Sequence, residues 1–300
     1  MRARRTPRRT LPNGDELFLV LDGHGEAGDR VSAFVKERFA QRVCAHAAFE
    51  TDLVSCLGDS IRSIEEEMLR SGGFDTAFSG TTFVCCVVRG DLLTAANIGD
   101  SRLTFGVSSR EGEALVAEPC TVDHKPDLPD EKARILAVGG RVFAVKYDDG
   151  IDGPARVWLA HADIPGLAMS RSLGDTVAHK AGVSSEPQFF QVEVRLSIIP
   201  SLSVSVCTPP PNDTRLSLPF KLEARHKCLV LATDGLWEFM TDADVIDVIK
   251  RSTGAENAVR ALVEEANNRW MREEQVIDDT TVALAFFRGW TPGGSGPTRA

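Results

Sequence analysis

The sequence lacks any pair of cysteines at the Cys-x-x-Cys spacing that is typical of zinc and dithiol redox motifs. Its seven cysteines are scattered, and several lie inside apolar runs, where a thiol packs as a small hydrophobic side chain. A reducing compartment is the simplest explanation. We therefore expect an intracellular protein, cytoplasmic or nuclear.

The sequence also lacks a long apolar run. No stretch approaches the ~18 apolar residues that a membrane-spanning helix needs. No apolar segment follows the arginine-rich start, as it would in a secretory signal. We expect neither a membrane span nor a secreted product.

Basic residues are the minority: 34 stand against 43 acidic residues, a formal net charge of -9. Five arginines fall in the first ten residues with no acid among them, which leaves 29 basic residues in the remainder. A body this acidic is a poor match for phosphate backbones, so nucleic-acid binding is not expected. The arginine-rich start has three open interpretations: a nuclear address, part of a transit peptide, or a disordered terminus. We expect residues 1–14 to be disordered.

What the sequence does contain is enough apolar material, 43% of 300 residues, for a substantial core. Apolar residues recur at helical spacing in two early and two late windows, the third opening on a capping-box pattern. The windows are 31–43, 53–68, 241–249 and 259–270. Alternating or continuous apolar runs predict strands at 17–21, 82–88, 92–97, 102–107, 229–233 and 281–287.

This order of elements predicts an α+β fold, a four-layer α-β-β-α sandwich of two stacked antiparallel sheets flanked by helix pairs. The three consecutive strands from 82 to 107 are expected to form an antiparallel meander. Composition predicts loops at 147–165 and about 197–225, and a flexible tail at 289–300. We expect residues 15–288 to form one domain.

Acidic turns are spread over the whole length of the chain. Asp22-Gly23 and Asp234-Gly235 each follow an apolar strand, so both deliver a carboxylate to a sheet edge. Carboxylates gathered in this way suit Mg²⁺ or Mn²⁺, which prefer oxygen ligands. The alternative is that these residues only form turns, because Asp-Gly is a common turn dipeptide and His24 lies between two glycines. The ensemble, rather than any one copy, indicates a cation site.

Nine ordered blocks resemble the PPM-type (metal-dependent, type 2C) protein serine/threonine phosphatases, and chance resemblance over so many blocks is very improbable. The blocks are FLVLDGHG at 18–25, SGTT at 79–82, ANIGDSR at 96–102, DHKP at 123–126, the pair Gly139-Gly140, LAMSRSLGD at 167–175, GVSSEP at 182–187, LATDGLW at 231–237 and DDTTV at 278–282.

The resemblance implies a β-sandwich with two Mn²⁺ or Mg²⁺ ions in a cleft at one end. Asp22 is similar to the carboxylate that bridges both metals, and Gly23 to the ligand that offers its backbone carbonyl. Asp234 and Asp278 look like ligands of the first metal, and Asp123 like a ligand of a third, weakly bound metal. His24 matches the general acid. Read from the residues alone, Asp123 and His124 fit a loop contact equally well.

The reaction implied is hydrolysis of phosphoserine and phosphothreonine in proteins by a metal-bridging water, without a phospho-enzyme, in a monomer. A metal-lowered water pKa supplies hydroxide near neutral pH, and a positioned histidine protonates the leaving alkoxide. The residues themselves favour a structural ion pair or a turn contact for Asp100 and Arg102 over a role as ligands. They likewise favour a structural role for Ser170, Arg171 and Asp175.

Two departures from the family pattern stand out. The segment before Asp22 shows no first strand carrying the family's phosphate-binding arginine and acidic pair, so the phosphate-binding residue is unknown. Asp279 stands where the family usually has Asn. These departures keep open a catalytically impaired phosphatase-like module or a truncated gene model. A further expectation is that the flap-like segment 141–165, with Asp148, Asp149, Asp152 and Asp163, favours substrates with basic residues near the phosphosite.

Overall fold

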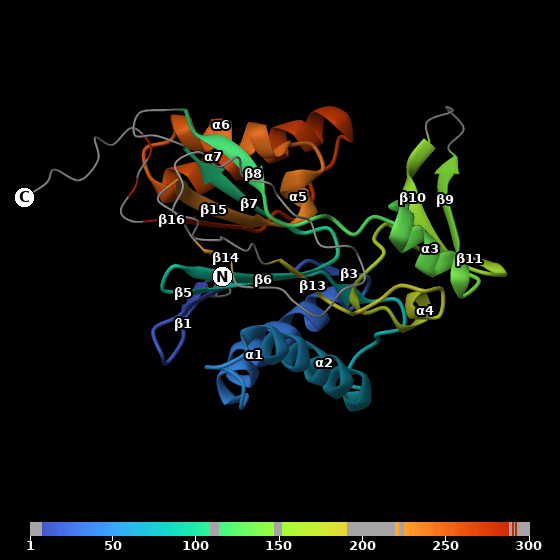
Figure 1. Cartoon of the computed structure of the whole chain (residues 1–300). Helices are drawn as coiled ribbons and strands as arrows, with labels where there is room; N and C mark the ends of the chain where they lie inside the picture. Colours follow the sequence, from blue (N-terminus) through green and yellow to red (C-terminus); the bar gives the residue numbers. More distant parts are fainter. Residues whose placement is uncertain are drawn as a thin grey trace, which may run out of the picture.

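The computed structural model describes residues 8–108, 114–146, 152–190, 220–221, 225–287, 290 and 292. Two antiparallel sheets are stacked face to face, and each carries a pair of helices on its outer side (Figure 1). The four-layer α-β-β-α sandwich predicted from the sequence is confirmed.

The first sheet has the strand order β1-β2-β5-β6-β13, and β14 also pairs with β6. Its strands are β1 (Arg8–Thr10), β2 (Glu16–Val20), β5 (Phe83–Arg89), β6 (Leu92–Ile98), β13 (Gln188–Phe190) and β14 (Phe220–Lys221). The second sheet has the order β16-β15-β7-β8. Its strands are β7 (Arg102–Val107), β8 (Val116–Pro119), β15 (His226–Ala232) and β16 (Val282–Phe286).

Strand β5 explains why the central strands read as continuous apolar runs. Its Phe83, Cys85 and Val87 point to the helices outside the first sheet. The alternate residues Val84 and Cys86 point into the space between the two sheets. A strand that is buried on both faces needs apolar side chains at every position.

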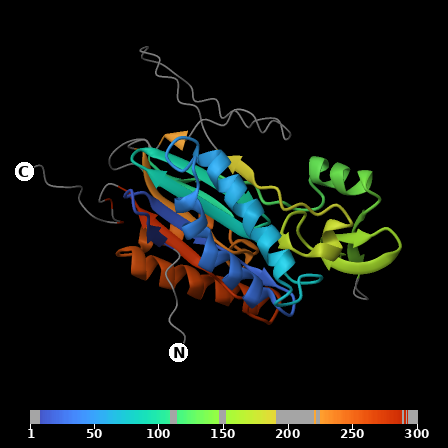
Figure 2. The ribbon, with the colours of Figure 1, turned by 90° about the horizontal axis from the view of Figure 1, so that it is seen from below.

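The helix pairs α1 (Gly28–Ala45) with α2 (Leu53–Ser71), and α6 (Asp242–Arg251) with α7 (Ala255–Glu273), cover the outer faces. Figure 2 shows α1 and α2 lying across the first sheet. The predicted capping box is present, since the Thr241 hydroxyl accepts from the Asp244 N–H and the Asp244 carboxylate accepts from the Thr241 N–H. None of the described helices is long and apolar enough to cross a membrane.

A small third sheet lies where the strands of the sandwich end. Its strands are β3 (Gly23–His24), β4 (Gly80–Thr81) and β12 (Leu173–Gly174), in the order β12-β4-β3. The short helices α4 (Thr176–His179) and α5 (Asp234–Trp237) begin directly after β12 and β15. Residues from the two ends of the chain are thereby brought to one end of the sandwich.

The segment expected to be a loop at 147–165 is mostly sheet, so that expectation is wrong. Strands β9 (Arg141–Lys146), β10 (Asp152–Leu159) and β11 (Ala162–Leu167) form an antiparallel sheet of their own. With α3 (Pro129–Ala137) and α4 they enclose a separate small core around Ile135 and Val157. We call residues 129–146 and 152–167 the flap, which extends beyond one end of the sandwich (Figures 1 and 2).

The predicted meander is correct for its first two strands and wrong for the third. Strands β5 and β6 are paired, but the chain turns at Gly99 (φ +99°) and crosses to the second sheet, where β7 pairs with β15 and β8. The turn permits the crossing because a positive φ of this size suits glycine.

The expectation of disorder at 1–14, with no strand before the one that leads to Asp22, is wrong for residues 8–14. Strand β1 pairs antiparallel with β2. Arg8 donates to Glu16 at 2.8 and 3.0 Å, and Leu11 is buried in the core. A cross-strand ion pair and one apolar anchor order this hairpin. Residues 1–7, nearly all of the predicted insertion at 197–225 and most of the tail at 289–300 lie outside the described residues.

Candidate active site

Asp22, which follows β2, is held in place by Thr82, which lies between β4 and β5. The Asp22 N–H donates to the Thr82 hydroxyl at 3.0 Å, and the Thr82 N–H donates to the Asp22 carbonyl at 2.8 Å. The same hydroxyl lies 2.7 Å from that of Ser101. The backbone of Asp22 is therefore tied to the turn that carries Asp100.

Gly23 is needed for the way the chain leaves the sheet. A Cβ at this position would lie 2.1 Å from the carbonyl oxygen of Gly28, at the start of α1. No side chain fits at that separation, so glycine lets the Asp22–His24 turn pack on the helix.

The second pair of acidic turns is brought together by another close approach. A Cβ on Gly235 would meet the carbonyl oxygen of Asp279 at 2.5 Å. The Thr281 N–H donates to the Thr233 hydroxyl at 3.0 Å, which fixes the loop before β16 on the end of β15. Asp278 is thereby brought near Asp234, 44 positions earlier in the chain. Asp279 is exposed, and its N–H donates to the Asp278 carboxylate at 2.8 Å.

The carboxyl groups of Asp22 and Asp234 share a hydrogen bond. Burial, that bond and the charges of Asp234, Asp278 and Asp100 raise the pKa of Asp22 to about 9. Burial and the charge of Asp100 raise the pKa of Asp234 to about 6. Neighbouring carboxyl groups resist being ionised together, which contributes to the raised pKa of Asp22.

This donor set has the right chemistry for a hard divalent cation. Carboxylate oxygens and a backbone carbonyl are the ligands that Mg²⁺ and Mn²⁺ prefer, and a cation would offset the repulsion between the carboxylates. In the part of the chain that is described, no group of three or more His, Cys, Asp or Glu side chains is placed so that it could hold a metal ion. The predicted ligands would therefore have to draw closer together around a cation.

His24 is paired with Asp175. The His24 Nε2 lies 2.6 Å from the Asp175 Oδ2, and the Ser172 hydroxyl donates to the same oxygen at 2.6 Å. Burial lowers the pKa of His24, but the hydrogen bond and charge of Asp175 outweigh it and raise the pKa above its usual value. The other ring nitrogen, Nδ1, is buried and has no hydrogen-bond partner among the described residues.

Asp175 is held firmly in an unusual backbone conformation. Its φ is +42°, which is uncommon for a residue with a side chain. Its N–H donates to the Ser79 carbonyl at 3.0 Å. A Cβ on Gly80 would lie 2.1 Å from the Asp175 Oδ2, so glycine leaves the space that the carboxylate fills. Local strain at a residue that contacts the predicted acid indicates a functional role.

The ion-pair partners of Asp100, Arg102 and Asp123 differ from those expected. Arg102 donates to both oxygens of Asp123 at 2.8 and 2.7 Å, and also to Asp242 at 3.0 Å. Asp100 is paired with Lys125 at 2.7 Å. The expected Asp100–Arg102 ion pair is therefore wrong, because each side chain pairs with a different residue. Any cation at Asp123 would share the carboxylate with Arg102.

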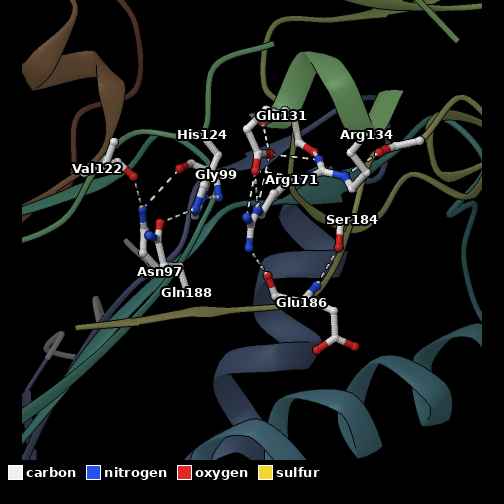
Figure 3. A network of polar contacts seen from close by, with 12 residues as sticks. Asn97, Gly99, Val122, His124, Glu131, Arg134, Arg171, Ser184, Glu186 and Gln188 are labelled. Atoms are coloured by element: carbon white, nitrogen blue, oxygen red, sulfur yellow. Dashed lines mark hydrogen bonds and ion pairs between the residues drawn. The ribbon is translucent and has the colours of Figure 1, made fainter. Parts of the chain in front are cut away.

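His124 is a structural residue, whereas its neighbour Asp123 faces the acids. Figure 3 shows the polar network to which His124 belongs. The Gly99 N–H donates to its Nδ1 at 3.1 Å, and its Nε2 contacts the Gln188 side-chain oxygen at 3.0 Å. Burial and the charge of Arg171 lower the pKa of His124 to about 3, so the ring is neutral.

The same network joins the flap to the sandwich through Glu131 (Figure 3). Arg134 donates to Glu131 at 2.8 Å, and Arg171 donates to it at 2.7 Å. Arg134 also donates to the Ser170 carbonyl, and Arg171 to that of Glu186. These contacts agree with the structural role expected for Ser170 and Arg171.

The structure brings together Asp22, His24, Asp234 and Asp278 of the predicted site, with Asp100 among them. Sequence reasoning missed Asp100 and Thr82, and it assigned Asp175 to the fold alone. The blocks GDSR and SLGD contained these residues, but their partners lie far away in the chain.

Comparisons with known proteins show which family the chain resembles. The family model described as Protein phosphatase 2C matches residues 9–274. A probable protein phosphatase 2C 64 from Oryza sativa subsp. japonica is 30% identical over 278 residues, which cover 90% of this chain and 58% of that protein. A probable protein phosphatase 2C 72 from Arabidopsis thaliana is 32% identical, covering 91% and 77% respectively.

A solved serine-threonine phosphatase 2C from Toxoplasma gondii superposes with a TM-score of 0.71 over 94% of this chain and 90% of that chain, at 22% identity. This likeness supports the fold. The chain spans little more than half the length of the rice relative. From the family model and the identities to these relatives, the chain belongs to the protein phosphatase 2C family.

Proposed function

We propose that the chain is a metal-dependent protein serine/threonine phosphatase that hydrolyses phosphoserine and phosphothreonine. The observation that carries this proposal is the half-buried Asp22–Asp234 pair, which lies near Asp278 and next to the Asp175-bound His24. Packing like charges together costs stability. A site that retains this cost is typical of one built to bind a counter-ion.

Asp22, the Gly23 carbonyl, Asp234 and Asp278 would hold two Mn²⁺ or Mg²⁺ ions, and Asp123 would contribute to a third, weaker one. When bound, such cations lower the pKa of a bound water and offset the charge of a phosphoryl group. Thr82 fixes the backbone of Asp22, and the 278–281 loop fixes Asp278 on the end of β15. The chain thus supplies a rigid backbone for each carboxylate.

His24 would act as the general acid. Its Nε2 is engaged by Asp175, so Nδ1 is the ring nitrogen left to carry a proton to the leaving alkoxide. The raised pKa favours the protonated form that an acid needs. Because His24 contacts a carboxylate rather than a serine or cysteine, attack by water without a phospho-enzyme is the simpler route.

Phosphorylated proteins are the proposed substrates, and the proposed state is a monomer inside the cell. The six described cysteines are free thiols, which supports a reducing compartment. A preference for basic substrates remains a prediction. Of the flap acids, Asp163 is paired with Arg141 at 2.7 Å, and Asp148 and Asp149 lie outside the described residues.

The test is turnover of a phosphothreonine peptide with Mn²⁺, with and without a chelator. We expect chelator-sensitive release of phosphate, and a loss of at least about 100-fold in Asp234→Asn because a first-metal ligand is removed. Asp247→Asn, on the exposed face of α6, is the control and should retain activity. A wild-type chain that gives no metal-dependent phosphate release would favour the alternative, a phosphatase-like binding module.

A further inference from the structure

A lysine, Lys125, lies beside the acidic cluster. Lys125 lies in the DHKP block, and its ammonium donates to the Asp100 Oδ2 at 2.7 Å. Its side chain is 31% exposed, whereas that of Asp100 is 2% exposed. The lysine is therefore anchored on a buried acid while its charged end stays within reach of solvent.

Hydrogen bonds connect this anchor to Asp22. Asp100 is followed by Ser101, whose hydroxyl lies 2.7 Å from that of Thr82. Thr82 in turn exchanges two backbone hydrogen bonds with Asp22.

The neighbouring arginines already form ion pairs or hydrogen bonds with other residues. Arg102 is shared between Asp123 and Asp242, and it also lies over the Trp237 ring, 5.0 Å from its centre. Arg171 is held by Glu131 and by the Glu186 carbonyl. Lys125 has three N–H donors, and its hydrogen bond to Asp100 uses one of them.

We propose that Lys125 binds the phosphoryl group of the substrate and of the phosphate product in this chain, with Asp100 as its positioning residue. The inference rests on the proposed function. A phosphoryl dianion that approaches a cluster of carboxylates is favoured by a positive side chain as well as by any bound cation.

The experiment compares the wild-type chain with Lys125→Met, Lys125→Arg and Lys250→Met in the presence of Mn²⁺. Lys250 is a matched control, because it donates to Asp247 at the same 2.7 Å with a similar exposure of 34%, but on α6. The readouts are KM and kcat for a phosphothreonine peptide and the inhibition constant of inorganic phosphate.

In Lys125→Met we expect KM and the phosphate inhibition constant to rise about tenfold or more, as for loss of a charge-assisted hydrogen bond. Lys125→Arg should restore most of the affinity, and Lys250→Met should match the wild type. An unchanged phosphate inhibition constant in Lys125→Met, with only a lower Tm, would overturn the proposal and leave a structural ion pair.

Two further measurements keep the outcome decisive. Lys125→Met could fail to fold because it leaves Asp100 unpaired, and the double variant Lys125→Met/Asp100→Asn then removes both charges. Its phosphate inhibition constant is compared with that of Asp100→Asn, and we expect the same rise. If the wild type shows no turnover, calorimetric binding of inorganic phosphate to the Mn²⁺-loaded chain decides. If phosphate binds and Lys125→Met weakens that binding, the phosphate-binding role of Lys125 is supported even though the proposed activity fails. If phosphate does not bind, or if Lys125→Met leaves its binding unchanged, the role of Lys125 is rejected.

Discussion

At the scale of single residues, Asp175 decides how His24 can act. The Asp175 carboxylate engages His24 Nε2 at 2.6 Å, so Asp175→Asn should leave the imidazole misdirected and less able to carry a proton. We expect kcat for a phosphothreonine peptide to fall roughly 100-fold, within the usual range for a general acid. The loss should be small for p-nitrophenyl phosphate, because nitrophenolate departs without needing a proton.

The comparison between the two substrates separates this role from a structural one. Asp247→Asn is the control, since Asp247 forms an ion pair with Lys250 on the surface of α6. Equal losses on the peptide and on p-nitrophenyl phosphate would mean that Asp175 only supports the fold. Rates alone do not distinguish the two roles, but their ratio does.

Residues that follow a strand could be predicted, and residues defined by a distant partner could not. Asp22 and Asp234 each come after an apolar run that the sequence displays, so their place at a sheet end follows from local pattern. Asp175 is 151 positions from His24, and nothing local reveals that the two meet. Lys125 likewise reads as a loop residue until Asp100 is placed beside it.

At the scale of elements, Glu131 holds the flap to the sandwich. Its side chain is 6% exposed and contacts both Arg134 and Arg171. Glu131→Gln would leave two guanidinium groups without their carboxylate, so we expect the free energy of unfolding to fall by about 3 kcal/mol in chemical denaturation. Glu256→Gln breaks an ion pair on α7 in which both side chains are at least 75% exposed, and it should cost no more than about 0.5 kcal/mol.

The contribution of Glu131 should depend on pH in a defined direction. Burial alone would raise its pKa, but hydrogen bonds from Arg134 and Arg171 lower it well below the ordinary 4.5. The folded state then binds the proton less readily than the unfolded state, so stability is present above about pH 4.5 and is lost as pH falls below it. The stability gap between the wild type and Glu131→Gln should narrow below that pH. A gap that is constant from pH 7 to 3 would contradict this.

The sequence predicts whether a segment forms a helix or a strand where the apolar pattern is local. It does not predict which strands pair with each other. The run at 102–107 is visibly a strand, but only the turn at Gly99 sends it to the second sheet instead of beside β6. The flap strands were missed for a similar reason. Glycine, aspartate and proline inside and between β9, β10 and β11 resemble loop composition, while the small core that orders them draws on α3 and α4 as well.

At the scale of the whole molecule, the sandwich gathers acids from both ends of the chain. Asp22 follows a strand of the first sheet, and Asp234 and Asp278 flank strands of the second. Stacking the two sheets places these carboxylates together, and the result is mutual repulsion in a buried setting. The family's cation chemistry and the stability of the fold are therefore linked through the same residues.

This linkage predicts opposite effects of one substitution with and without metal. In the metal-free chain, Asp22→Asn removes a carboxyl group that must take up a proton on folding, because its pKa is raised to about 9, so the Tm should rise by a few degrees over the wild type. Saturating Mn²⁺ should raise the Tm of the wild type by roughly 5 °C or more, because binding only to the folded state contributes about 2.7 kcal/mol at 100 times the dissociation constant. Asp22→Asn should lose most of that rise, whereas Asp247→Asn should keep it, and a chelator should reverse it. Differential scanning fluorimetry measures all four cases, and an equal Mn²⁺-induced shift in the wild type and Asp22→Asn would show that Asp22 is not a ligand.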